Sequence, residues 1–308
     1  MEVYEGIAQF HRLKNAIVTS GTFDGVHKGH QVILKRLHEI AKKSNGETVL
    51  ITFWPHPRMV LNHDKSTFLK LINTFDEKKE YLAENGIAHL IKIHFTEEFA
   101  LTSSEDFIKN ILVDSIGTKK LVIGYNHRFG RNREGSFENL IVDAPKYGFE
   151  VEEIPRHEID HIGISSTKIR KALNIGDIET ANLYLGRNFV LNGKVIHGDK
   201  LGRKLGFPTA NIHISETYKL RPATGIYAIY VRVRDNRHKG MLNIGLRPTI
   251  DGTAKRVEVH ILNFNQNIYD ESIQLEFIKR FRDEKKFKNL DALRKQLEKD
   301  RTLVNKIL

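Results

Sequence analysis

Residues 16 to 30 read Ala16-Ile17-Val18-Thr19-Ser20-Gly21-Thr22-Phe23-Asp24-Gly25-Val26-His27-Lys28-Gly29-His30, and this stretch sets the fold class of the amino-terminal half. The apolar run at its start predicts a buried strand, and the glycines that follow predict a tight loop. Apolar residues then recur at three- and four-residue spacing from Ile33 to Ala41, which predicts a helix that ends at Asn45-Gly46. The sequence therefore predicts a strand, a loop and a helix in succession.

Strand-like and helical patterns keep alternating through the first half of the chain. The pattern gives a strand at 48–53, a helix at 74–86, a strand at 90–93, a helix at 104–116, a strand at 120–124, a helix at 136–147 and a short strand at 150–154. Thr74 and Glu77 have the spacing of a capping box. Because strands alternate with helices, we expect a parallel sheet wound by right-handed crossovers, in an α/β domain of the Rossmann-like kind.

His27 and His30 follow the loop and lie one helical turn apart. A helix N-terminus offers unpaired N–H groups and a positive partial charge, so imidazoles placed there can donate jointly to a polyphosphate. A metal site is a second interpretation, although the chain has no cysteine and no Glu placed as in the zinc protease helix motif. A purely structural role is the third.

The second half of the chain has the pattern of a small β domain. Residues 225–234 and 256–262 are rich in β-branched and aromatic residues and lie between turn-rich breaks. No crossover helix is expected between these runs, so we expect hairpins that close into an antiparallel β-barrel. A terminal helix is expected to pack against the barrel through one apolar face, formed by Leu290, Leu293, Leu297 and Val304.

A glycine-rich run, Gly198-Asp199-Lys200-Leu201-Gly202-Arg203-Lys204-Leu205, precedes the hexapeptide Gly206-Phe207-Pro208-Thr209-Ala210-Asn211. Main-chain N–H groups of such a loop can converge on phosphate oxygens, and its basic residues add charge of the right sign. Thr209 and Asn211 lie on one side of an extended segment, where a hydroxyl and an amide oxygen could share a hard cation such as Mg²⁺. The alternative is a polar loop before an edge strand, with Pro208 shaping the turn.

The hexapeptide resembles the signature of riboflavin kinases. Further pieces of that family's pattern follow in order: Gly225-Ile226-Tyr227, Asn243-Ile244-Gly245, Pro248-Thr249, Glu258-Val259-His260 and Phe281-Arg282-Asp283-Glu284-Lys285-Lys286-Phe287. The resemblance covers nearly everything from about Gly186 onward. Asn263 stands where that family usually has Asp, and Asp270 stands where a Gly often follows the Tyr; both departures concern flavin affinity or loop detail more than the chemistry.

This resemblance implies roles for particular residues. ATP and its phosphates would be bound by Gly198, Lys200, Gly202, Lys204 and Gly206. Mg²⁺ would be held by Thr209 and Asn211, and the flavin would be contacted by Arg282. Glu258 would be the general base for the hydroxyl of the substrate. Without the resemblance, Glu258 would be interpreted as a solvent-facing strand carboxylate, since charged residues are mostly exposed.

The stretch from Gly21 to His30 is similar to the His-x-Gly-His element of nucleotidyltransferases related to class I aminoacyl-tRNA synthetases, and in its full wording to bacterial FAD synthetases. Other elements of that family follow: Trp54-Pro55-His56-Pro57-Arg58, Gly124-Tyr125-Asn126-His127-Arg128-Phe129-Gly130 and Ile164-Ser165-Ser166-Thr167-Lys168-Ile169-Arg170. Each follows or precedes a predicted regular element, which is where an open α/β sheet places its ligand residues.

The second resemblance implies a second set of roles. The ATP phosphates would be bound by Gly21, Phe23, His27, His30, His56, Ser165, Ser166, Thr167 and Arg170, and the flavin by Asn126 and Phe129. Taken alone, Ser165-Ser166-Thr167 would be an ordinary helix N-cap, a role that is also compatible with phosphate binding. Without the resemblance, His56, which lies between two prolines, would be interpreted as part of a rigid surface turn.

Composition places the chain among globular proteins with two domains. Its 308 residues are 40% apolar, and we expect domains at 1–185 and 186–308. No apolar run is long enough to span a membrane and no apolar signal segment begins the chain; with no cysteine present, we expect a cytoplasmic protein. The net charge of +11 fits either polyanionic nucleotides or RNA, which could be bound by Arg128, Arg131, Arg133 and Lys168. Acidic residues are interspersed with the basic ones, which favours solvated faces over an RNA-binding module.

The two resemblances together imply a bifunctional enzyme of flavin cofactor synthesis. The carboxyl half would transfer a phosphoryl group from ATP to riboflavin, giving FMN, and the amino half would adenylylate FMN to FAD with release of pyrophosphate. The product of the first reaction is the substrate of the second, so both halves are expected on one chain. Adenylylation of another phosphorylated metabolite is the alternative. The expected partners are riboflavin, FMN and ATP, with Mg²⁺ as cofactor and without nucleic acid or membrane, and the oligomeric state is not predicted.

Overall fold

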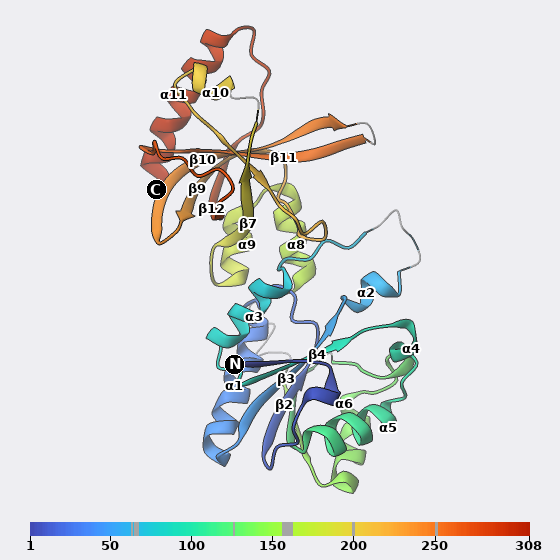
Figure 1. Cartoon of the computed structure of the whole chain (residues 1–308). Coiled ribbons are helices and arrows are strands. Elements are labelled where there is room, and N and C mark those ends of the chain that lie inside the picture. The colour runs from blue at the N-terminus through green and yellow to red at the C-terminus, as the bar shows by residue number, and fades with distance from the viewer. Residues whose placement is uncertain (63, 65–67, 126, 156–162, 199–200, 250–251) are drawn as a thin grey trace. The chain divides into compact units, whose positions relative to one another are not determined.

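The computed structural model describes residues 1–308 except 63, 65–67, 126, 156–162, 199–200 and 250–251 (Figure 1). The chain divides into two compact units, Met1–Ser166 and Thr167–Leu308. Within the described residues, no helix is both long and apolar enough to cross a lipid bilayer.

The first unit is built on a parallel sheet, which confirms the predicted sheet type. The sheet has six strands in the order β1-β4-β3-β2-β5-β6. The strands are β1 (Glu2–Glu5), β2 (Ala16–Ser20), β3 (Glu47–Trp54), β4 (His89–His94), β5 (Thr118–Gly124) and β6 (Glu150–Ile154). From β2 the chain moves outward through β3 to β4 and then returns to β5 on the other side of β2. Strand order therefore reverses between β2 and β5, and open α/β sheets bind ligands at such a point, outside the carboxyl ends of the strands.

Helices cover both faces of this sheet, which is why its strands are apolar on both sides. They are α1 (Lys28–Ser44), α2 (Pro57–Val60), α3 (Phe75–Glu84), α4 (Glu97–Ala100), α5 (Ser104–Asp106), the π-helical η2 (Phe107–Ile116) and α6 (Phe137–Asp143), with short 3₁₀ turns η1 (Ile7–Gln9), η3 (Arg131–Arg133) and η4 (Ala144–Tyr147). One core cluster joins α1 to the sheet through Leu34 and Leu37, and the other joins η2 through Ile108 and Leu112. The predicted capping box is confirmed, because Thr74 and Glu77 exchange hydrogen bonds at the start of α3.

The second unit is a closed antiparallel barrel with strand order β10-β11-β8-β7-β12-β9, which confirms the predicted barrel. The strands are β7 (Phe189–Ile196), β8 (Ala210–His213), β9 (Gly225–Val233), β10 (Asn236–Thr249), β11 (Gly252–Ile261) and β12 (Ser272–Arg282). Helices α8 (Ser166–Ile175) and α9 (Ile178–Leu185) come before the barrel, α10 (Leu201–Lys204) is a single turn, and α11 (Leu290–Ile307) ends the chain.

Side chains of the barrel strands alternate between two faces. On β11, Val257, Val259 and Ile261 are buried, as expected for positions that point into a small barrel. Arg256, Glu258 and His260 therefore point to the opposite, outer face. The predicted terminal helix, drawn in red in Figure 1, packs on this outer side through Val304, against Phe207, Ala228 and Met241.

Candidate active sites

Five barrel residues lie at one level around the barrel because the strand register aligns them. Asn211 of β8 pairs with Glu258 of β11, and Glu258 pairs with Asn243 of β10. Asn243 also pairs with Ile226 of β9, which pairs with Arg282 of β12. Residues directly opposite each other on antiparallel strands send their side chains to the same face. All five side chains line one cavity of about 390 Å³ on the outer face of the barrel.

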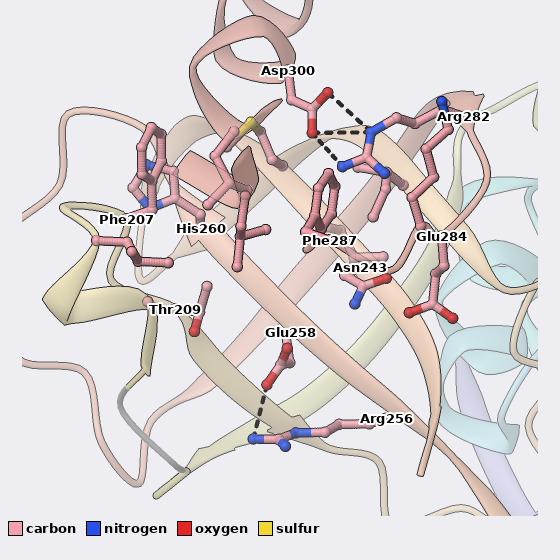
Figure 2. A pocket seen from close by; sticks show the side chains of 18 of the residues that line it. Phe207, Thr209, Asn243, Arg256, Glu258, His260, Arg282, Glu284, Phe287 and Asp300 are labelled. Atoms are coloured by element: carbon pink, nitrogen blue, oxygen red, sulfur yellow. Dashed lines mark hydrogen bonds and ion pairs between the residues drawn. The ribbon is translucent and has the colours of Figure 1, made fainter. Parts of the chain in front are cut away.

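This cavity, the α11 cavity, has an apolar wall and a polar wall (Figure 2). Its apolar side chains come from the barrel, from α11 and from the segment before α11: Leu205, Phe207, Met241, Phe287, Leu293 and Leu297. Its polar side chains include Thr209, Asn211, Asn243, Glu258, Arg282 and Glu284. A volume of this size with a few placed polar groups is typical of a site for a small organic ligand.

Glu258 is held by an ion pair within the cavity. Its Oε1 lies 2.8 Å from Nη2 of Arg256, and Nε of Arg256 donates to Oδ1 of Asn211 over 2.7 Å. The guanidinium group therefore joins the proposed general base to one of the two proposed Mg²⁺ ligands. Arg256 was not predicted, although its place two residues before Glu258 puts it on the same face of the strand.

Thr209 lines a second cavity as well as the α11 cavity. The second cavity, of about 520 Å³, is bounded by the segment 264–269 and by Arg203, Pro208 and Thr209, and we call it the 264–269 cavity. His197 stacks on Tyr269 beside this segment, with ring centroids 4.0 Å apart. The hydroxyl-bearing Thr209 therefore stands where the two cavities meet.

The glycine-rich run is only partly an open loop, because Leu201–Lys204 form the helical turn α10. At Gly202 a Cβ would lie 2.2 Å from the carbonyl oxygen of Phe207, and at Gly198 it would lie 1.8 Å from the amide of Asn211, so both positions need glycine. Gly206 follows with a φ of 79°, in the left-handed region that favours glycine. Lys204 is exposed, and Lys200 lies outside the described residues.

Arg282 lines the α11 cavity, but its guanidinium group is engaged with α11. Nε donates to both carboxylate oxygens of Asp300 over 3.0 Å, and Nη2 also pairs with that carboxylate. Nη1 donates to the carbonyl oxygen of Asp283 over 2.9 Å. Asp300 is 2% exposed and accepts a further hydrogen bond from Gln296. Figure 2 shows this pair at the upper end of the cavity and the Arg256–Glu258 pair at the lower end.

His260 is a further residue of the α11 cavity, and the sequence predicted no role for it. Its Nδ1 donates to the carbonyl oxygen of Pro208 over 2.8 Å, and its ring meets Phe207 edge to face. Burial lowers the pKa of His260, which keeps the ring neutral at neutral pH. The contact ties β11 to the hexapeptide that carries Thr209.

The candidate site of the first unit is the loop between β2 and α1. His27 is the N-cap of α1, and its Nδ1 accepts the backbone N–H of His30 over 3.3 Å. The two imidazole rings stack, with centroids 3.7 Å apart and an interplanar angle of 14°. Because Nδ1 of His27 is an acceptor, a neutral His27 carries its proton on Nε2 and can donate from there. The structural role of His27, as the N-cap of α1, is therefore present.

Neighbouring segments meet this loop at the carboxyl edge of the sheet. Phe23 contacts His30, with ring centroids 4.8 Å apart, and Oγ of Ser166 donates to the carbonyl oxygen of Asp24 over 2.8 Å. Ser20, at the end of β2, hydrogen-bonds with Nε2 of His127, which follows β5, over 3.2 Å. The loop, Ser166 and the segment after β5 thus lie together at the reversal of strand order.

The remaining predicted residues of this site are described by their own surroundings rather than by a contact with the loop between β2 and α1. His56 is buried after β3 and caps α2, with Nδ1 accepting the N–H of Arg58 over 3.1 Å. Phe129 is 8% exposed and packs between His127 and Phe107. Ser165 is exposed, Asn126 lies outside the described residues, and Thr167 and Arg170 belong to α8 in the second unit.

In the part of the chain that the structure describes, acidic and histidine side chains form no cluster typical of a metal centre. Within the described residues, no three of them lie close enough together to hold an ion. The residues that the structure describes therefore give a metal at His27 and His30 no third protein ligand of these types.

Comparisons with known proteins cover nearly the whole chain. A family model described as FAD synthetase matches residues 9–168, and one described as riboflavin kinase matches residues 185–308. A bifunctional riboflavin kinase/FMN adenylyltransferase of Buchnera aphidicola subsp. Schizaphis graminum is 40% identical, over 99% of this chain and 98% of its own. The protein of that name from Escherichia coli K12 is 35% identical, over 97% and 96%. A crystal structure from Streptococcus pneumoniae, of a protein called macrolide-efflux protein, matches with a TM-score of 0.90 and 30% identity, covering 99% of this chain and 98% of that one.

Proposed function

The chain belongs to the family of bifunctional riboflavin kinases/FMN adenylyltransferases, and from this premise we propose which residues carry its two reactions. The carboxyl half phosphorylates riboflavin to FMN, and the amino half adenylylates FMN to FAD, with ATP as substrate of both. In this proposal the functional domains are residues 1–185 and 186–308. The proposed location is the cytoplasm, because the chain has no cysteine.

In the kinase half, riboflavin occupies the α11 cavity and ATP occupies the 264–269 cavity. This arrangement is supported by the position of Thr209, which lines both cavities, while Glu258 lines the α11 cavity. A terminal hydroxyl of the ribityl chain can then reach Glu258 while the γ-phosphate enters from the other side. The aromatic and leucine side chains of the α11 cavity suit the flat isoalloxazine ring.

The kinase step needs one proton acceptor. Glu258 takes the proton of the ribityl hydroxyl as its oxygen forms a bond to the γ-phosphorus, while the bond between that phosphorus and the bridging oxygen of ADP breaks. Arg256, 2.8 Å from the carboxylate, fixes the orientation of Glu258. Arg282 acts through Asp300 and positions α11, which supplies part of the wall around the flavin.

Thr209 and Asn211 have the donor chemistry that Mg²⁺ prefers. Hydroxyl and amide oxygens are hard ligands, and Mg²⁺ is usually held by few protein ligands together with substrate phosphates. In this structure a cationic guanidinium group already bridges Oδ1 of Asn211 and Oε1 of Glu258, so these oxygens form a place that accepts positive charge. Bound there, Mg²⁺ would neutralise charge on the ATP phosphates.

In the adenylyltransferase half, the nucleophile is the substrate itself. A phosphate oxygen of FMN forms a bond to the α-phosphorus of ATP, and the bond to pyrophosphate breaks. A phosphate monoester is already ionised near neutral pH, so positioning and charge stabilisation suffice. Nε2 of His27 and the ring of His30 bind the triphosphate at the N-terminus of α1. Gly21, Phe23, His56, Ser165, Ser166, Thr167 and Arg170 support the phosphates, and Asn126 and Phe129 support the flavin.

A time course of the purified protein tests the proposal. We expect riboflavin, ATP and Mg²⁺ to give FMN first and FAD later, separated by chromatography. A reaction that starts from FMN should give FAD and pyrophosphate without riboflavin, and omission of Mg²⁺ should stop the kinase step. If the protein forms no FMN while a control enzyme is active under the same conditions, the kinase assignment is wrong. If FAD forms from FMN without added ATP, the adenylyltransferase assignment is wrong.

A further inference from the structure

The loop between β2 and α1 has a backbone that its residue types do not favour. Phe23 and Val26 have φ values of 45° and 37°, in the left-handed region where residues other than glycine are uncommon. Val26 is β-branched, which makes this conformation still less favourable. Such a backbone persists only when surrounding contacts determine it. The contacts that hold the loop therefore decide where His27 and His30 point.

Several of these contacts come from one segment, Ile72–Lys78. The carboxylate of Asp24 accepts the backbone N–H groups of Ile72 and Asn73, at 3.0 and 3.3 Å. Nζ of Lys78, in the first turn of α3, donates to the carbonyl oxygen of Thr22 over 2.8 Å. The same carbonyl accepts the hydroxyl of Thr52, from β3, over 3.4 Å. Hydrogen bonds therefore hold the loop at Thr22 and at Asp24, the residues on either side of Phe23.

Lys78 is an unusual residue for this position because it is 3% exposed. Its Nζ lies 5.5 Å from the ring centroid of Trp54 and 6.0 Å from that of Phe75, within the range of cation–π attraction. A buried lysine stabilises a fold poorly unless its charge is used, since burial disfavours the ammonium form. A methionine would fill the same space without that cost.

The charged groups around Lys78 are few and well defined. Burial lowers the pKa of Lys78 to about 8, and Asp24 of the loop opposes the shift. On α3 itself, the carboxylate of Glu77 accepts from Asn73 and from the N–H of Thr74. On β4, Lys92 lies over the ring of Phe75 at 4.5 Å, and β3 presents Thr52 and Trp54, which do not titrate.

We propose that Lys78 is a positioning residue of the adenylyltransferase reaction, whose ammonium group holds the loop Gly21–Val26 in the shape that lets His27 and His30 bind the triphosphate. The proposal rests on the roles proposed above for the two histidines. Lys78 does not touch the substrate. It acts through the carbonyl oxygen of Thr22, to which its Nζ donates a hydrogen bond.

The pH dependence has a defined sign. Below the folded-state pKa the ammonium makes a charge-assisted hydrogen bond to Thr22, and as the pH rises through about 8 that group becomes neutral and the bond weakens. FAD formation should therefore lose activity above about pH 8. Folding has the opposite dependence: the unfolded lysine keeps its proton to higher pH, so the folded unit gains stability between about 8 and the ordinary lysine pKa of 10.5. The contribution of Lys78 thus has opposite signs for activity and for stability, and a denaturant titration at each pH separates the two.

The test uses Lys78→Met in the full-length protein, with Lys79→Met as the matched control on the exposed side of the same helix. At pH 7 we expect kcat/KM for ATP in the FMN-to-FAD reaction to fall at least about tenfold in Lys78→Met, as for loss of a hydrogen bond from a charged group. Lys79→Met should match the wild type. Riboflavin phosphorylation by the same preparations should be unchanged in both variants. The ratio of wild-type to Lys78→Met activity should shrink above pH 8.

Trp54 gives a second measurement that needs no variant. It is the single tryptophan of the chain, so its fluorescence in flavin-free protein should titrate with a midpoint near 8 as Lys78 loses its proton. The FAD-forming activity of the wild type should fall with the same midpoint. Equal activity of Lys78→Met and wild type at pH 7, or a wild-type rate that stays flat from pH 7 to 9, would overturn the proposal. If His30→Ala is inactive while Lys78→Met is fully active, the proposal for Lys78 is wrong and the roles of the histidines stand. If His30→Ala is active, the histidine roles are wrong, and the proposal for Lys78 falls with them.

Discussion

The two proposed nucleotide sites of this chain are assembled in contrasting ways. In the first unit, one continuous segment, Gly21–His30, supplies the loop, the helix N-terminus and both histidines. In the second unit, Asn211, Glu258 and Asn243 come from three strands, and α11 closes the wall. A continuous site depends mainly on local backbone and its supports. An assembled site depends on strand register and on packing between segments far apart in the sequence.

The largest effect is expected when the proposed general base of the assembled site is removed. Glu258→Gln keeps the size of the side chain but removes the proton acceptor, so FMN formation should fall by about 10²–10⁴-fold, the usual contribution of a general base. FAD formation from FMN, measured by chromatography on the same sample, should persist because it uses the other unit. If both activities disappear in a folded variant, the two sites are not independent and the contrast fails.

A slightly smaller effect is expected in the continuous site. His30→Ala removes one donor from a preorganised anion site, which should lower FAD formation by about a hundredfold, by analogy with loss of one oxyanion donor. FMN formation should stay near the wild-type rate. Because the rings of His27 and His30 stack at 3.7 Å, the double variant should lose less than the sum of the two single losses. A strictly additive double variant would show that the two rings do not act on one group.

The third prediction asks whether a helix far along the chain controls the assembled site. Asp300→Asn breaks the buried pair with Arg282, so the second unit should lose about 3 kcal/mol of unfolding free energy, measured by denaturant titration. The KM for riboflavin should rise because α11 lines the cavity. Glu298→Gln on the same helix is the control, since its exposed pair with Arg294 contributes little. An unchanged KM in Asp300→Asn would mean that α11 does not position the flavin.

The smallest effect is expected from a change at the start of α3, which tests whether the continuous site depends on the N-cap of that helix. Thr74→Ala removes the N-cap of α3, the helix that carries Lys78, and should cost the first unit about 1 kcal/mol of unfolding free energy. FAD formation at room temperature should change little, because the buried contacts of Lys78 and Asp24 remain. A large loss of FAD formation without unfolding, seen by comparing rate and circular dichroism, would show that the cap itself sets the loop geometry.

Much of the fold could be predicted because its signals are periodic and strong. The parallel sheet, the barrel and the terminal helix follow from alternating strands and helices, from β-rich runs and from the spacing of the leucines. Strand β1 was not predicted, since Glu2–Glu5 is short, carries an acidic residue at each end and forms only by pairing with β4. The turn α10 was also not predicted, because four residues give too little local signal for a helix.

In the sites, too, local sequence predicted some residues, whereas contacts between distant residues could not be predicted. Glu258, Thr209 and Asn211 share one cavity, and the family signature named all three. The contacts that orient them could not be predicted, since Arg256 and Asn211 are 45 residues apart and Arg282 and Asp300 are 18 apart. Lys78 and Thr22 are 56 apart and nothing in the local sequence joins them. Local patterns identify the chemistry, whereas tertiary packing decides which groups hold it in place.

The closed barrel has a consequence for how the length of this chain can vary. Deleting one residue within β11 before Glu258 would turn that carboxylate from the outer face to the interior and bring a valine into the cavity. Around Glu258 the strand cannot slide to compensate without breaking hydrogen bonds on both sides, because Val257–Val259 of β11 pair with β10 and with β8. Residues added between β9 and β10, at Arg234-Asp235, would instead lengthen a hairpin tip and leave the register intact. Insertions, tags or fused domains are therefore expected to be tolerated at that tip and to abolish phosphorylation when placed inside the strands.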